Sequence, residues 1–190
     1  MKIKALKHIL RTSAKESRRN LSSEERQILN AQILAEFLNV FSCKGLKISI
    51  YLSITTQFEI DTIPWITALE KDNEIYVPIT NFETLTLSHC KYNTGDAITC
   101  NRYGIPEPSD CTKTIDPIEL DLVIIPLLVA DLQGNRLGYG KGFYDRFLTQ
   151  CREDVLKVGL NYFEPIAQIP TEDTDIPLNY LVSPTRCYQF

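Results

Sequence analysis

The chain has 190 residues, of which 44% are hydrophobic and 23% are charged, and its formal net charge is −4. This length suits one domain with a sizeable core, and the composition is that of a globular rather than a disordered protein, so we expect residues 1–190 to form a single domain. No stretch approaches the roughly 18 consecutive apolar residues that span a bilayer, and no apolar segment of a secretory signal follows the basic N-terminus, which together predict a cytoplasmic protein without a membrane partner.

The first half of the chain alternates helical with extended patterns. Apolar residues at helical spacing predict a helix over residues 3–18. A second helix is expected within residues 21–38, where Ser22 and Glu25 have the spacing of a capping box. The pattern then predicts a strand at 46–53, a helix at 61–71 with Pro64 in its first turn, and short strands at 74–79 and 84–89.

The second half of the chain continues this alternation. Residues 121–129 form a nearly unbroken apolar run, which is typical of a strand covered on both faces. A helix is expected at 142–153, a buried strand at 155–161 and a last strand at 179–183. Strands that alternate with helices predict an α/β fold, with a largely parallel central sheet flanked by helices. Ligands of such sheets bind beyond the carboxyl ends of the strands.

The positive charge of the chain is concentrated at its N-terminus. Residues 1–20, here called the basic head, hold seven Lys and Arg and one Glu, which leaves 13 basic and 23 acidic residues of the 20 and 24 in the whole chain. The head therefore carries +6 and the remaining 170 residues carry −10. Such a head either binds phosphate groups or docks on the acidic body of the protein, and the charges leave both alternatives open.

The six cysteines stand singly, without a C-x-x-C pair, in a chain that also holds two histidines. In a chain of this length without a signal sequence, this usage predicts reduced thiols in the cytosol. A His-rich zinc site is not expected with so few histidines. A bound metal would therefore be held by oxygen ligands.

The segment RLGYGKGFYDRF, residues 136–147, places three glycines at alternate positions directly before a predicted helix. It fits neither the Walker A loop nor the dinucleotide fingerprint, but bare backbone N–H groups beside a helix N-terminus suit an anion. Lys141 and Arg136 add charge for a triphosphate, and Asp145 is placed to hold Mg²⁺. The alternative is a glycine-rich turn that begins a helix, with Lys141 in solvent.

The glycine segment and its surroundings, LLVADLQGNRLGYGKGFYDRFL, closely resemble the signature of the 5-formyltetrahydrofolate cyclo-ligases, also called methenyltetrahydrofolate synthetases. Weaker resemblances to that family occur in order along nearly the whole chain. These further segments are LKHILR, SSEER, YLSITTQFEIDT, NRYGIPEPSD and IPTEDTDIPLNYLVS.

Membership of this family implies both a fold and a reaction. The fold is a three-layer sandwich of the NagB, RpiA and CoA-transferase type. The implied reaction uses ATP and Mg²⁺ to convert 5-formyltetrahydrofolate into 5,10-methenyltetrahydrofolate, ADP and phosphate, through a phosphorylated N5-formyl intermediate. Such a transfer needs positioning and charge neutralisation more than a catalytic histidine.

The resemblance also implies three overlapping sets of site residues. Those matching the ATP contacts are Lys7, Arg11, Arg136, Leu137, Gly138, Tyr139, Gly140, Lys141, Gly142, Phe143 and Tyr144. Those matching the folate contacts are Ile54, Glu59, Asp61, Tyr139, Gly140, Lys141, Gly142 and Phe143. Those matching the Mg²⁺ carboxylates are Asp145 and Asp175. The catalytic candidates are Lys141, Arg136 and Tyr144, with Lys141 expected to stabilise charge on the transferred phosphoryl group.

Structural alternatives exist for many of these residues, and two positions depart from the family pattern. The Lys7 and Arg11 pair also fits a solvated basic helix face, and Phe143 and Tyr144 also fit helix packing. Asp145 also suits a first helical turn. The remaining alternatives and departures are Asp61 as a solvated loop acid, Ile54 as a core residue, Asp173 as a rival to Asp175, Thr174 in place of the usual histidine, and Asn179 in place of the usual aspartate.

Two other functions remain open on the sequence. The basic head also suits a non-catalytic nucleotide- or RNA-binding relative, although the chain as a whole is acidic and the head lacks the aromatic residues of single-strand binders. The third hypothesis is an enzyme of the same kind that acts on another small phosphorylated metabolite. Under the leading hypothesis the partners are small molecules, with no nucleic acid, and the protein is a monomer.

Overall fold

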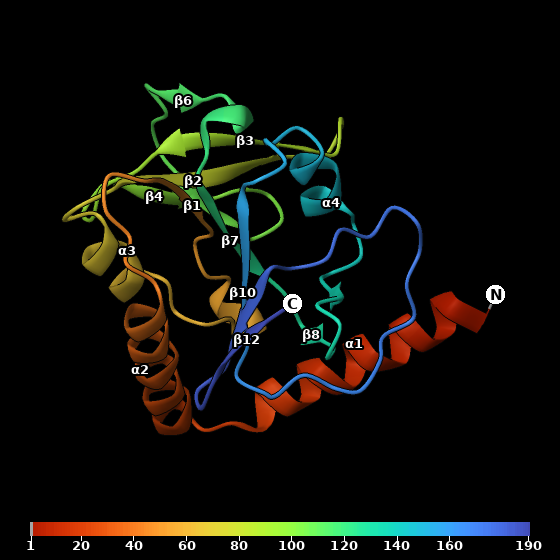
Figure 1. Cartoon of the computed structure of the whole chain (residues 1–190). Coiled ribbons are helices and arrows are strands. Elements are labelled where there is room, and N and C mark those ends of the chain that lie inside the picture. The colour runs from red at the N-terminus through yellow and green to blue at the C-terminus, as the bar shows by residue number, and fades with distance from the viewer. Residues whose placement is uncertain (1) are drawn as a thin grey trace.

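An eight-stranded sheet lies at the centre of the computed structural model, which describes residues 2–190 (Figure 1). The strand order is β12-β11-β10-β7-β1-β2-β3-β6, and the five strands from β11 to β2 run parallel. The strands of this sheet are β1 (Lys47–Ile50), β2 (Glu74–Asn81), β3 (Thr86–Lys91), β6 (Thr114–Ile115), β7 (Leu122–Pro126), β10 (Leu156–Leu160), β11 (Tyr180–Val182) and β12 (Cys187–Gln189).

Helices and two small hairpins complete the chain (Figure 1). The helices are α1 (Lys2–Asn20), α2 (Ser23–Val40), α3 (Ile63–Leu69) and α4 (Phe143–Leu148), with 3₁₀ turns η1 (Thr55–Gln57) and η2 (Pro117–Glu119). The hairpins are β4 (Ile98–Cys100) with β5 (Pro106–Pro108), and β8 (Val129–Ala130) with β9 (Arg136–Leu137).

The side chains of β7 show why the sheet has helices on both faces. Leu122 and Ile124 are fully buried in a core that contains α2 and α3, whereas Val123 and Ile125 are fully buried in a second core that contains α4. Since alternate residues of a strand point to opposite faces, an all-apolar strand must be covered twice. The expected α/β fold with a largely parallel central sheet is therefore confirmed.

The start of α2 follows the capping pattern in the sequence. The Ser22 hydroxyl accepts a hydrogen bond from Glu25 N at 3.1 Å, and Ser22 N donates one to the Glu25 carboxylate at 2.7 Å. These two bonds satisfy backbone groups that a helix end leaves without partners. The predicted helix start is therefore confirmed, as is Pro64 in the first turn of α3.

Several predicted elements are shorter than expected, among them the strand at 46–53, of which Lys47–Ile50 forms β1, and the helix at 61–71, of which Ile63–Leu69 forms α3. The apolar run 121–129 is not one strand, because β7 ends at Pro126, which has no N–H to continue a ladder, and the chain then turns into β8. The helix predicted at 142–153 ends at Leu148. Beyond it the backbone forms turns, and Arg152 bonds to Asp121 at 2.9 Å, next to the start of β7.

The segment 179–183 is not the last strand, as the sequence pattern suggested. It contains β11, but β12 follows and pairs with it antiparallel, with Leu181 opposite Tyr188. The small strands β4, β5 and β6 were not predicted either. Each is only two or three residues long, which is too short for an alternating pattern to stand out in the sequence.

The expectation of six reduced thiols is wrong for two cysteines. Cys90 of β3 and Cys111, which precedes β6, form a disulfide with Cα atoms 5.7 Å apart. Because β3 pairs with β6, these residues, 21 positions apart in sequence, are brought within bonding distance. The free cysteines are Cys43, Cys100, Cys151 and Cys187.

None of the helices within residues 2–190 combines the length and the apolar character that a membrane crossing requires.

Candidate functional site

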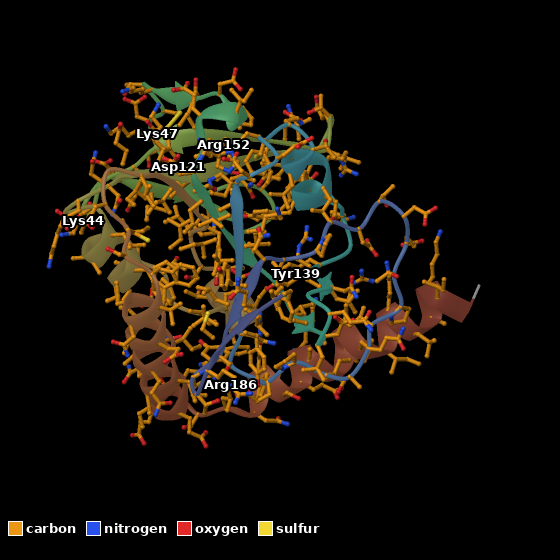
Figure 2. The ribbon with its side chains drawn as sticks, in the orientation of Figure 1. Lys44, Lys47, Asp121, Tyr139, Arg152 and Arg186 are labelled. Carbon is orange, nitrogen blue, oxygen red and sulfur yellow. A yellow bond between two sulfur atoms is a disulfide. The ribbon has the colours of Figure 1, made fainter. Side chains whose placement is uncertain are left out.

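A cavity of about 380 Å³ lies at the carboxyl ends of the parallel strands. Its wall includes Leu52 after β1, Thr80 near the end of β2, Pro126 at the end of β7, and the glycine segment, which begins with β9. This is the position expected for a ligand of a parallel sheet. Lys47, Asp121 and Arg152 gather away from Tyr139, near the opposite ends of β1 and β7 (Figure 2).

The cavity brings together all but one of the predicted site residues. Those lining it are Lys7, Arg11, Ile54, Glu59, Arg136, Leu137, Gly138, Tyr139, Gly140, Lys141, Gly142, Phe143, Tyr144, Asp145 and Asp175. Asp61 does not line it. Its carboxylate accepts a hydrogen bond from Ile63 N at 3.1 Å, at the N-terminus of α3, so its role as a folate ligand stays a prediction.

The glycine segment has a backbone that side chains would disturb. Gly140 has φ +89° and Gly142 has φ +68°, a left-handed region that glycine adopts without strain. A Cβ on Gly140 would lie 3.1 Å from the Arg11 guanidinium carbon. Arg11 Nε also donates to the Gly138 carbonyl at 2.8 Å. The segment is thus a glycine-rich turn against which the Arg11 side chain of α1 packs.

Lys7, on the same helix, is held by acidic residues. Its ammonium contacts Glu172 at 2.9 Å and Asp175 at 2.7 Å, and its side chain is almost completely buried. Burial lowers the pKa of Lys7, but hydrogen bonds and charge from Asp175 and Glu172 outweigh burial, so the net shift is upward. The basic head therefore docks on the acidic body and also lines the cavity, which combines the two alternatives that the charges left open.

Arg136 presents an unpaired part of its guanidinium in the cavity wall. Its Nη2 donates to Asp145 at 2.7 Å, whereas its Nη1 is buried and has no hydrogen-bond partner among the described residues. The side chain is only 5% exposed. Burial lowers the pKa of Arg136, and the nearby Asp145 opposes that shift. A buried cation with an unused donor is a favourable place for an anionic ligand.

Asp145 and Asp175 lie near each other, because the Asp145 carboxylate contacts the backbone N–H of Ile176, the residue after Asp175. The Asp145 Oδ1 atom accepts from Arg136 and from Ile176 N at 3.3 Å, and the Asp175 Oδ2 atom accepts from Lys7 and from Glu172 N. Within residues 2–190 no three His, Cys, Asp or Glu side chains cluster as a complete metal site. Two carboxylates, each with its second oxygen outside the described hydrogen bonds, fit a Mg²⁺ ion that takes its other ligands from phosphates and water.

The cavity wall also holds a buried acid, Glu59. The Glu59 carboxylate accepts from Tyr139 Oη at 2.5 Å and from Ile54 N at 2.7 Å. Burial raises the pKa of Glu59, and these hydrogen bonds oppose the rise. Burial also raises the pKa of the Tyr139 hydroxyl well above its usual range, so Tyr139 remains the proton donor of the pair.

Aromatic rings not identified in the sequence complete the wall. The ring centroids of Phe82 and Tyr103 are 3.7 Å apart, and Phe143 meets Phe82 edge-on at 5.1 Å. Tyr103 belongs to the NRYGIPEPSD segment, whose Ile105 and Pro106 also line the cavity, so the signal was present there. Nothing in the sequence around Phe82 marked it.

Known proteins resemble this chain in sequence and in fold. A model described as the 5-formyltetrahydrofolate cyclo-ligase family matches residues 3–184. The 5-formyltetrahydrofolate cyclo-ligase of Haemophilus influenzae is 32% identical over 175 residues, covering 89% of this chain and 92% of that protein. The Escherichia coli protein of the same name is 28% identical over 181 residues, covering 93% and 99%. The solved structure of 5,10-methenyltetrahydrofolate synthetase from Aquifex aeolicus matches with a TM-score of 0.82 at 30% identity, covering 97% and 92%.

Proposed function

The chain belongs to the 5-formyltetrahydrofolate cyclo-ligase family, a family of enzymes, and we propose that it converts 5-formyltetrahydrofolate into 5,10-methenyltetrahydrofolate with ATP and Mg²⁺. The family assignment made from the sequence motifs is thereby confirmed. The observation that carries the proposed reaction is that a single cavity is lined by the glycine turn, by cations and by the buried carboxylate of Glu59.

The glycine side of the cavity is the proposed site of the ATP phosphates. Backbone N–H groups without neighbouring Cβ atoms allow close approach to phosphate oxygens. Arg11, Arg136 and Lys141 supply positive charge there. Asp145 and Asp175 would hold Mg²⁺, which neutralises charge on the phosphates when it is bound.

In the proposed first step, the formyl oxygen attacks the γ-phosphorus of ATP, the bond from that phosphorus to the ADP oxygen breaks, and the formyl group becomes an iminium phosphate on N5. N10 then bonds to the formyl carbon and loses its proton. Phosphate leaves with the electron pair of the carbon–oxygen bond, which completes the methenyl ring. The protein's part is to hold both reactants in line and to neutralise charge, for which Lys141 and Arg136 are the proposed catalytic residues.

The folate is proposed to occupy the side of the cavity that holds Glu59. A carboxylate there accepts hydrogen bonds from the amino and ring N–H groups of a pterin. Ile54 and the rings of Phe143, Phe82 and Tyr103 supply apolar surface for the flat parts of the ligand. Tyr139 of the glycine segment bonds to Glu59, so the proposed folate and phosphate sites adjoin.

The test is the growth of methenyl absorbance in the near ultraviolet when the purified protein meets 5-formyltetrahydrofolate and Mg-ATP. Wild type should form the product and ADP in equal amounts, and Lys141→Ala should lower kcat by about a hundredfold. Lys44→Ala is the matched control, because Lys44 is exposed and lies away from Tyr139 (Figure 2). Wild-type protein without product at saturating Mg-ATP would refute the function, and a fully active Lys141→Ala variant would refute the role of that charge.

The alternative, a non-catalytic nucleotide- or RNA-binding relative, would be favoured by salt-sensitive RNA retention without folate turnover. The pairing of Lys7 with Glu172 and Asp175 disfavours RNA binding, because acidic residues of the protein already neutralise the positive charge of Lys7. Folates that fail to compete for the site would instead favour another phosphorylated substrate. We also propose a monomer, which a mass measurement in solution tests directly.

A further inference from the structure

Arg18 is a buried cation that contacts Tyr139 of the glycine segment from outside the cavity lining. It lies near the end of α1 and is only 2% exposed. Its Nη2 donates to the Leu127 carbonyl, and its Nη1 lies 3.4 Å from the Tyr139 hydroxyl. Arg18 does not line the cavity. Any effect of Arg18 on a ligand must therefore pass through Tyr139 or through its charge.

Tyr139 carries that contact on to Glu59. The phenol donates to the Glu59 carboxylate at 2.5 Å, and the other carboxylate oxygen accepts from Ile54 N. Three segments that are distant in sequence thus meet in one chain of polar contacts, from α1 through the glycine segment to the loop after β1. The chain of contacts ends at the carboxylate that faces the proposed folate side.

Among the groups around the Glu59 carboxylate, Arg18 supplies the compensating positive charge. Glu59 is 8% exposed, so water screens it poorly. The other titratable groups near Glu59 are the tyrosines Tyr51, which follows β1, and Tyr144 of α4, and burial raises the pKa of both, so they carry no charge at neutral pH. The Tyr162 hydroxyl donates to the Glu59 backbone carbonyl rather than to its carboxylate. Lys15 lies over the Tyr139 ring, with its ammonium 5.4 Å from the centroid. The positive charge that acts on Glu59 itself is that of Arg18.

We propose that Arg18 is a positioning residue for folate binding: through its contact with Tyr139 and through its charge, it keeps the buried Glu59 side chain a hydrogen-bond acceptor for the N–H groups of the ligand. This inference rests on the proposed function, since it names how the folate side of that site is maintained. An ionised carboxylate accepts hydrogen bonds from ligand N–H groups, whereas a protonated one presents a donor to them. Loss of Arg18 should therefore weaken folate binding most at acidic pH.

The direction of the pH effect follows from the charges. Burial raises the pKa of Glu59 above its ordinary value near 4.5, while Tyr139 and Arg18 lower it. Removing the cation moves the pKa further upward, so a larger fraction of Glu59 is protonated as the pH falls toward that value. At alkaline pH the carboxylate is ionised with or without Arg18, and the difference disappears.

The experiment compares Arg18→Met with Arg19→Met, because Arg19 is the exposed neighbour on the same helix. The dissociation constant of 5-formyltetrahydrofolate is measured by calorimetry without ATP from about pH 5.5 to about pH 8.5, together with kcat and both KM values. Circular dichroism and thermal unfolding report whether each variant folds. Arg18→Lys keeps the charge with a single donor group, and Tyr139→Phe keeps Arg18 but breaks the hydrogen bond to Glu59.

For Arg18→Met we expect the acidic limb of folate binding, the pH range in which affinity falls with pH, to lie at higher pH than in wild type, so that the affinity is severalfold weaker at the acidic end of the range. Near pH 8 the affinity and kcat should stay close to wild type, and the KM for ATP should not change. Tyr139→Phe should move the limb in the same direction, Arg18→Lys should restore it at least partly, and Arg19→Met should leave it in place.

Affinity lowered equally at every pH, or not lowered at all, would overturn the positioning role of Arg18. If Arg18→Met does not fold, an unmoved acidic limb in folded Tyr139→Phe overturns it as well. Wild-type protein that binds no folate at any pH would instead refute the proposed function, so the two failures can be told apart.

Discussion

A methyl group added at Gly140 tests whether the backbone shape of the glycine turn matters for ATP. Gly140 has φ +89°, and alanine in a left-handed conformation costs about 1–2 kcal/mol relative to glycine. The new Cβ would also lie 3.1 Å from the Arg11 guanidinium carbon and 3.3 Å from one of its nitrogens. The free energy of unfolding of Gly140→Ala should therefore fall by about 1–2 kcal/mol.

The same substitution, Gly140→Ala, should also weaken the binding of ATP. Relief of the crowding moves Arg11, whose Nε donates to the Gly138 carbonyl at 2.8 Å. Arg11 is also a proposed ATP contact, and a hydrogen bond between a charged group and a ligand contributes about 1.5–3 kcal/mol, of which each 1.4 kcal/mol corresponds to about tenfold in a binding constant. We therefore expect the KM for ATP of Gly140→Ala to rise by roughly tenfold or more.

Gly45→Ala separates backbone strain from the loss of the Arg11 contact. Gly45 has φ +68°, but a Cβ there would meet no atom within 4 Å, and the residue lies between α2 and β1. Both variants are assayed by urea unfolding and by initial rates at varied ATP. Gly45→Ala should lose similar stability with an unchanged KM for ATP. Equal KM values for the two variants would refute the role assigned to the Arg11 contact.

Three further predictions concern stability and cysteine chemistry. Gly159→Ala places a Cβ 2.5 Å from Leu127 Cδ2 in the core and should destabilise by about 1–3 kcal/mol, which a fully retained Tm would contradict. Burial lowers the pKa of His89 to about 3, so between that value and an unfolded value near 6.5 stability should fall by about 1.4 kcal/mol for each unit of decreasing pH, and His89→Phe should remove that part of the slope in urea titrations. Thiol titration of the unfolded, unreduced protein should find the four free cysteines, and six after reduction; six before reduction would mean that the bond from Cys90 to Cys111 does not form.

Local sequence patterns determined much of the fold. The apolar run that contains β7 predicted a strand covered on both faces, because every one of its side chains needs an apolar neighbour. Ser22 and Glu25 predicted the start of α2, because a capping box uses atoms within four residues of one another. The glycine segment likewise predicted a bare turn near the sheet, since the absence of a Cβ is a property of the residue itself.

Tertiary structure decided which of these local features meet. Lys7 and Asp175 are 168 residues apart in sequence, and Tyr139 and Glu59 are 80 apart, so no spacing in the chain announces either contact. The position of Asp61 beside the N-terminus of α3, rather than in the cavity, depends on how the loop after β1 leaves the sheet. Contacts of this kind arise from the packing of whole elements against one another, whereas periodicity and capping act within a few residues. For that reason the sequence by itself pointed to many residues of the cavity wall, although not to Phe82, and to none of the contacts between them.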